Sequence, residues 1–190
     1  NIVAGHLDRL RLDTNGLTED DSRYRIRVSG IMKRYYGELM LSLAGQFNVR
    51  GFWYDWRKDL RLAAAQLQAR IDSWFPDGEP VHLVAHAAGG LVARTYIHQF
   101  PQRWNVEPKG EAGEKSQSRL IMLGTPNYGL YTTIQAITGH LELLQWVDLV
   151  DTHHDRTDFR EIVRSFPSLY QLLPTPSPTS KERDKLMALY

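Results

Sequence analysis

Apolar residues recur at helical spacing in two stretches of the first half of the chain. The first stretch is formed by Ile31, Tyr35, Leu39 and Leu43, and Gly45 follows as a stop signal. The second predicts a helix whose buried face carries Leu60, Ala64, Leu67, Ile71 and Trp74. Both patterns indicate amphipathic helices with one face turned toward a core.

Shorter apolar or alternating runs predict strands between these helices. Residues 24–28 alternate apolar side chains with arginine, residues 47–54 are aromatic and branched, and residues 120–123 form a short apolar run that predicts a buried strand. Together with the apolar run that begins at Val81, the order is strand, helix, strand, helix, strand. This order predicts a parallel sheet with right-handed crossovers, and hence an α/β protein.

The chain is organised around residues 81–90, which read Val-His-Leu-Val-Ala-His-Ala-Ala-Gly-Gly. A strand pattern turns abruptly at residues 85–89 and continues as a helical pattern over residues 91–100. The turn has the frame of a nucleophile elbow, G-x-S-x-G, in which small residues let the strand and helix approach closely. Ala87 stands where the serine would be, and a methyl group is no nucleophile. The alternative interpretation is an ordinary strand-turn-helix whose alanines serve close packing.

The pattern changes after Gly129. One amphipathic helix is predicted to carry Ile134, Ile137, Leu141, Leu144, Val147 and Val150. A shorter helix is predicted over residues 158–164, and residues 101–118 suggest a mobile surface insertion. We therefore divide the chain into a core segment (1–129), a helical cap (130–174), and a linker or the start of a further segment (175–190). The alternative is that the later helices simply cover the sheet.

Three further motifs resemble one family. Tyr54-Asp55-Trp56-Arg57, Gly124-Thr125-Pro126-Asn127-Tyr128-Gly129, and Phe166-Pro167-Ser168-Leu169-Tyr170 with Leu172-Leu173-Pro174 are similar to the lecithin:cholesterol acyltransferase-like branch of the α/β-hydrolases. The resemblance implies the α/β-hydrolase fold, a parallel-sheet core with a helical cap, incomplete at both ends. A Pro-Gly oxyanion loop is expected before Asn1, and the acid and histidine of a triad after Tyr190.

The resemblance also implies a lipase, phospholipase or acyltransferase with position 87 as its nucleophile. The backbone N–H of Ala88 would supply half of the oxyanion hole. Water as acceptor makes a hydrolase, and a sterol or another alcohol makes an acyltransferase. Arg57 is expected to be structural and paired with an acidic neighbour, and His86 to pack under the elbow without acting as a base. The adjacent His153, His154 and Asp155 are interpreted as a solvated loop.

Alanine at position 87 allows two explanations. In the first, the serine of an enzyme has been replaced by alanine; in the second, a natural pseudoenzyme has kept the fold as a lipid-binding or protein-interaction module. We favour the first, because Gly89, Gly90 and Ala85 preserve a turn suited to presenting residue 87. A third hypothesis is a structural α/β domain inside a larger assembly.

Composition limits the partners further. The 190 residues, 42% of them hydrophobic, suit one domain with a substantial core. The 23 basic and 22 acidic residues give a net charge of +1, so neither a nucleic-acid surface nor an anionic-membrane patch is expected, and Lys33 and Arg34 are interpreted as a solvated helix face. No cysteine occurs, which excludes disulfides and favours a cytoplasmic location. No cofactor and no metal are expected. The expected partner is a lipid or acyl ester, with transient membrane contact through the cap and a larger polypeptide or assembly as further hypotheses.

Overall fold

Helices make up most of the regular structure. The computed structural model describes residues 6–106, 117–140 and 156–175, and the following statements concern these residues. The helices are η2 (Leu7–Leu10, a 3-10 helix), α1 (Lys33–Ala44), α2 (Leu60–Trp74), α3 (Gly89–Gln99), α4 (Pro101–Trp104), α5 (Tyr131–Thr138), α7 (Arg156–Arg164) and α8 (Pro167–Gln171). The strands are β1 (His82–His86) and β2 (Arg119–Leu123).

The sheet corrects the predicted fold class. β1 and β2 pair in parallel, with Val84 opposite Ile121 and His86 opposite Leu123, and they are the two strands of the described sheet. The part of the chain that the structure describes is thus a small mixed α/β arrangement. The prediction of an α/β-hydrolase fold with a parallel-sheet core was wrong for this structure.

Two of the predicted strands are missing for a physical reason. Residues 24–28 and 47–54 form no strand. In the second stretch Phe52 and Tyr54 stack on each other, with ring centroids 5.9 Å apart, and pack against the core by their side chains. Aromatic residues fit a pleated surface, but they also bury well without one, so their presence signals burial more surely than a strand partner.

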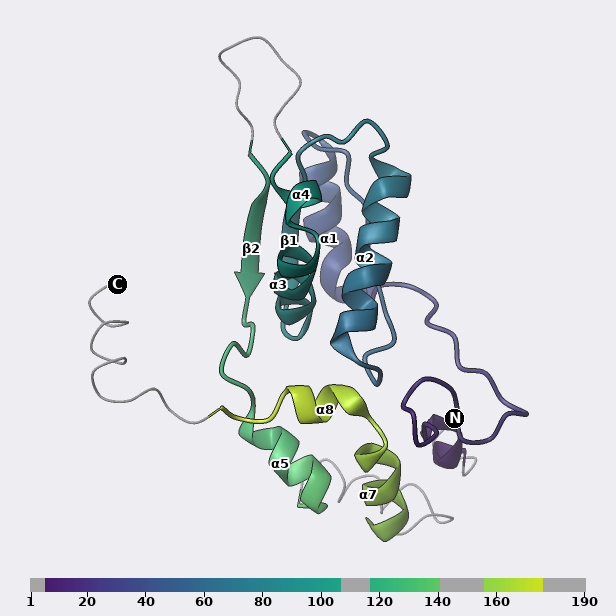
Figure 1. Ribbon diagram of the computed structural model, residues 1–190. Helices are drawn as coiled ribbons and strands as arrows, with labels where there is room; N and C mark the ends of the chain where they lie inside the picture. Colours follow the sequence, from purple (N-terminus) through teal and green to yellow (C-terminus); the bar gives the residue numbers. More distant parts are fainter. Residues whose placement is uncertain (1–5, 107–116, 141–155, 176–190) are drawn as a thin grey trace, which may run out of the picture.

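The main core lies between α2, α3 and β1. Its buried members are Leu60, Ala63, Ala64, Leu67, Ile71, Val81, Val92 and Tyr96. Figure 1 shows α2 and α3 running side by side next to the strands, and Leu83 of β1 packs against this core. The periodic apolar face predicted for α2 is therefore confirmed. The predicted helix over residues 91–100 is confirmed as α3.

The opposite face of β1 meets α1. Side chains alternate along a strand, so His82 and His86 lie on the other side from Leu83. His82 makes an edge contact with Phe47, and His86 bonds to Tyr36 of α1. The helix predicted up to Gly45 is confirmed as α1, but none of its residues is buried. β2 is also confirmed as a strand, whereas its predicted burial is wrong, because Ile121, Met122 and Leu123 are exposed.

A second cluster joins the start of the chain to the later helices. Leu7 and Leu12 pack with Ala136 of α5, with Ile162 and Val163 of α7, and with Phe166. In Figure 1 α5, α7 and α8 form a group below the two strands. The division at residues 129 and 174 stays a prediction, and this cluster shows that residues 7–12 pack with the proposed cap.

The later helices agree with the sequence only in part. α7 confirms the helix predicted over residues 158–164, whereas α5 ends at Thr138 and is followed by Gly139, a left-handed residue with φ of 81°. The rest of the long helix predicted to Val150 lies outside the described residues, as do most of the insertion at 101–118 and residues 176–190. No helix in the described ranges is long and apolar enough to cross a membrane.

Candidate active site

The turn after β1 has an unusual backbone. β1 ends at His86, Ala87 follows with φ of 50°, and α3 begins at Gly89. Ala87 is the one residue other than glycine with a positive φ in the described ranges. A left-handed L-residue costs about 1–2 kcal/mol, so surrounding contacts must hold it in place.

Hydrogen bonds supply part of that hold. The Ala87 N–H donates to the carbonyl of Leu123 in β2 at 2.9 Å, and the Ala87 carbonyl accepts from the Gly90 N–H at 3.0 Å. The first bond extends the parallel ladder past the end of β1, and the second closes the turn into α3. Hydrogen bonds therefore hold both the N–H and the carbonyl of residue 87, at the carboxyl end of the sheet.

The two glycines of the turn have different roles. A Cβ placed on Gly90 would lie 2.0 Å from Oγ1 of Thr125, which follows β2. Gly90 is thus required for the close approach of α3 to the chain beyond β2. A Cβ on Gly89 would meet nothing within 4 Å. The packing at the turn therefore requires glycine at position 90, whereas position 89 has room for a side chain.

The backbone amides at the start of α3 are suited to an anion. Ala88 adopts helical angles, with φ of −58° and ψ of −21°. Within the described ranges neither its N–H nor that of Gly89 donates a hydrogen bond. Such unpaired N–H groups at a helix start can donate hydrogen bonds to an oxygen on which negative charge develops. The oxyanion-hole role expected of Ala88 stays a prediction.

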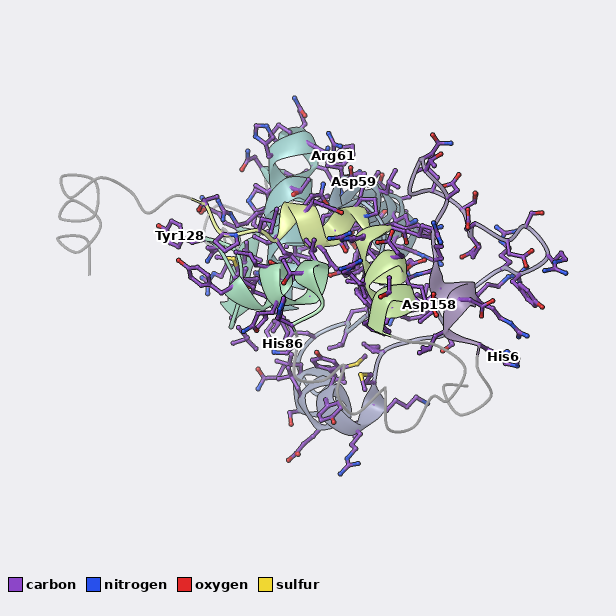
Figure 2. All side chains as sticks on the ribbon, turned by 90° about the horizontal axis from the view of Figure 1, so that it is seen from below. His6, Asp59, Arg61, His86, Tyr128 and Asp158 are labelled. Atoms are coloured by element: carbon purple, nitrogen blue, oxygen red, sulfur yellow. The ribbon has the colours of Figure 1, made fainter. Side chains whose placement is uncertain are left out.

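His86 is engaged beside the turn rather than beneath it. Its Nδ1 lies 2.7 Å from the hydroxyl of Tyr36, and the two rings are 5.9 Å apart. His86 is exposed, so the expectation that it packs under the elbow was wrong. Figure 2 shows it at the edge of the sheet, toward α1. Its position is explained by the contact with Tyr36.

His153, His154 and Asp155 lie outside the described residues. His140, which the sequence analysis does not single out, shares a hydrogen bond with the hydroxyl of Thr138. No cluster of three or more histidines and carboxylates that could hold a metal ion occurs in the described ranges.

Arg57 is the centre of a buried ionic network. Its guanidinium donates to Asp55 through Nη2 at 2.6 Å and Nε at 2.9 Å, and to Glu19 Oε1 at 3.0 Å. Nη1 donates to the carbonyl of Leu10 at 2.8 Å. The predicted pairing of Arg57 with an acidic neighbour is confirmed. The Nε, Nη1 and Nη2 groups of Arg57 all donate to other residues of the protein.

The charged groups of this network shift one another's pKa values. Burial is the largest single influence and raises the pKa of Glu19 and of Asp55, but the hydrogen bonds and charge of Arg57 together with backbone hydrogen bonds lower both pKa values by more. Burial lowers the pKa of Arg57, and its bonds to Asp55 and Glu19 raise it by more. All three groups are therefore held in their charged forms.

Sequence reasoning missed two residues that position these elements. Glu19 lies 38 residues before Arg57, in a polar run without a helix or strand pattern. Gln171 of α8 accepts a hydrogen bond from the Leu60 N–H at 2.8 Å and donates to Asp59 at 2.8 Å, and so ties α8 to the start of α2. Neither Glu19 nor Gln171 is marked by a pattern in the residues around it. Asp59 is, because an aspartate just before an apolar helical period marks the start of a helix.

The later helices lie near the end of the sheet that carries Ala87. β1 and β2 are parallel, so their carboxyl ends meet at one edge. Figure 1 shows α5 and α8 beyond the carboxyl end of β2. The N–H of Leu130 donates to the Leu172 carbonyl at 2.8 Å, which fixes the entry to α5 against the end of α8. This placement is compatible with the cap hypothesis.

Comparisons with known proteins add no relative. No family model matches the chain, and no curated protein or solved structure gives a significant match.

Proposed function

We propose that the chain carries the nucleophile position of a serine-dependent lipid ester hydrolase or acyltransferase, in a form that Ala87 makes inactive. One observation carries the proposal: the left-handed Ala87 between a strand and a helix, with φ of 50°. A turn that strains residue 87 and holds it at the carboxyl end of the sheet has the geometry that presents a nucleophile. An alanine in a plain packing turn has no need of that strain.

The chemistry follows from the same turn. A serine at position 87 would attack the ester carbonyl through Oγ and lose its proton to a histidine that an acid holds. The oxygen of the tetrahedral intermediate would accept from the Ala88 N–H, a donor that contributes on the order of 3 kcal/mol in such sites. Collapse of the intermediate releases the alcohol and leaves an acyl ester on residue 87. Water or a second alcohol then takes the acyl group.

The test is Ala87→Ser in the full-length protein, assayed with a fatty-acyl ester and a phospholipid. We expect hydrolysis to rise on the order of 10³-fold or more over the alanine form, since removal of a serine nucleophile costs at least that much. A serine-directed fluorophosphonate should also form a covalent adduct at residue 87, which mass spectrometry locates. The matched control is Ala88→Ser, which places a hydroxyl one residue later, at a helical backbone position.

Equal reactivity of Ala87→Ser and Ala88→Ser would contradict the proposal. If the serine form is folded but inert, and the alanine form still binds the acyl ester, the second candidate is supported. That candidate is a lipid-binding module without catalysis. It is compatible with the turn between β1 and α3 and with alanine, which supplies no nucleophile, at position 87.

A further inference from the structure

The segment around α1 carries a local charge excess that the whole-chain total conceals. Residues 22–50 contain a single carboxylate, Glu38. The same stretch contains the basic residues Arg23, Arg25, Arg27, Lys33, Arg34 and Arg50. The rest of the chain offsets this excess, which is why the net charge is only +1.

Most of these cations are available to a partner. Arg25, Arg27, Lys33 and Arg34 are exposed. None of these four forms a salt bridge with another described residue. Arg23 differs, because it is bound to Asp21 at 2.6 Å. Unpaired exposed cations at this density attract an anionic surface.

An apolar stripe on α1 accompanies the cations. Met32, just before the helix, is 63% exposed, Tyr35 is 66% exposed and Leu39 is 41% exposed. Their spacing of three and four residues places them on one face of the helix. Leu41 and Phe47 add further exposed apolar surface. No residue of α1 is buried, so the stripe stays at the surface of the described structure.

α1 is nevertheless anchored. Tyr36 bonds to His86, and the Met40 side chain reaches to 3.5 Å from where a Cβ on Gly51 would lie. These contacts use one side of the helix and leave the stripe of Met32, Tyr35 and Leu39 at the surface. These contacts tie the helix to β1 and to Gly51, while Met32, Tyr35 and Leu39 remain exposed.

We propose that the α1 segment (residues 25–47) docks the protein on a lipid bilayer that contains anionic lipids. Arginine and lysine side chains would meet the headgroups, and the stripe would enter the boundary between headgroups and acyl chains. Aliphatic side chains such as Leu39 and Met32 favour a bilayer over a nucleic acid, which offers phosphates but no apolar layer for them. Docking needs no catalysis at position 87, so it stands apart from the proposed function.

The primary test is sedimentation of the unmodified 190-residue chain with vesicles. We expect binding to vesicles of phosphatidylcholine with about one third phosphatidylserine, weak binding to pure phosphatidylcholine, and a loss of binding as salt shortens the range of the charges. Equal binding to both vesicle types, or none to either, would overturn the proposal.

Two pairs of matched variants locate the contact. Lys33→Gln with Arg34→Gln should lower the partition coefficient at least tenfold, at about fivefold for each basic residue. The control removes two exposed arginines elsewhere, Arg70 and Arg94, and should change it less than about threefold. Leu39→Ser should weaken binding at least about threefold, and Leu62→Ser on α2, a residue of similar exposure, should not.

Binding to single-stranded RNA separates the two kinds of anionic partner. If the chain binds RNA as tightly as vesicles, and Leu39→Ser leaves vesicle binding unchanged, the contact is with phosphate alone and the bilayer proposal fails. Circular dichroism checks each variant, and the vesicle series with the unmodified chain decides the question even where a variant does not fold.

Discussion

The buried network at Arg57 allows a strong test of the structure. Arg57 is 2% exposed and Glu19 is 8% exposed, so Arg57→Met would leave the Glu19 carboxylate buried without its cation. The methionine fills part of the volume but makes no hydrogen bond. The carbonyl of Leu10 would lose its donor as well.

The expected cost is large because only one partner is removed. Breaking a buried ion pair from one side typically destabilises a protein by about 3–5 kcal/mol, which is a sizeable share of a total stability of about 5–15 kcal/mol. The matched control is Arg61→Met. Arg61 pairs with Asp59 in the same way, but its side chain is 69% exposed, so we expect almost no change in the free energy of unfolding.

The pH dependence provides a second, independent signature. In the unmodified protein the pKa values of Glu19 and Asp55 are lowered, so their contribution is complete above the unfolded pKa values and is lost as pH falls through the folded ones. In Arg57→Met the hydrogen bond and the charge of Arg57 are lost, while burial and the backbone hydrogen bonds from Glu19 and Ile26 remain, so the pKa of Glu19 is higher than in the unmodified protein. The folded variant then takes up a proton as pH falls, which relieves the buried charge. The difference between the two proteins should therefore shrink from pH 7 to pH 4.

Urea unfolding followed by tryptophan fluorescence measures both effects. A cost below about 1 kcal/mol at pH 7 would refute the reasoning, since it is far below that of an unpaired buried charge. A cost that stays constant between pH 7 and pH 4 would show that Glu19 is not the group left unpaired.

Two further substitutions test the turn and the start of α2. Ala87→Gly should raise the free energy of unfolding by up to about 1 kcal/mol, because glycine adopts the left-handed conformation without the steric cost. Ala88→Gly is the control and should lower the free energy of unfolding, because Ala88 has helical angles. If both variants have a lower free energy of unfolding than the unmodified protein, residue 87 is not strained. Asp59→Ala should cost about 1 kcal/mol at pH 7, since Asp59 accepts the Arg61 N–H at 2.7 Å as a helix cap. The hydrogen bond from the Arg61 side chain is the main reason that the pKa of Asp59 is lowered to about 2, so this contribution should fade only as pH falls toward 2, which thermal unfolding at several pH values can follow.

Local features of the fold could be predicted from the sequence. The apolar period of α2 and the aspartate before it specify a capped amphipathic helix without reference to any distant residue. The turn at Ala87 likewise follows from small residues between an apolar run and a helical period. In both cases the information lies within one stretch of chain.

Features that depend on distant partners could not be predicted. The aromatic run at residues 47–54 suits a strand by composition, but a strand also needs a neighbour that supplies ladder hydrogen bonds. Gln171 caps α2 across 111 residues, and no local pattern links the two. The exposure of β2 has the same origin, because an apolar run does not reveal whether another element covers it.

The proposed function depends on one of these distant contacts. The G-x-S-x-G frame alone does not hold residue 87 in its strained conformation, because the N–H that fixes it donates to Leu123 of β2. The chain beyond β2 also supplies Thr125, whose side chain occupies the space that Gly90 leaves open. β2 thus holds the turn in place through this hydrogen bond, even though most of the side chains of β2 are exposed. The orientation of residue 87 is therefore a property of the pairing between β1 and β2, and an elbow motif has chemical meaning only where such a pairing holds it.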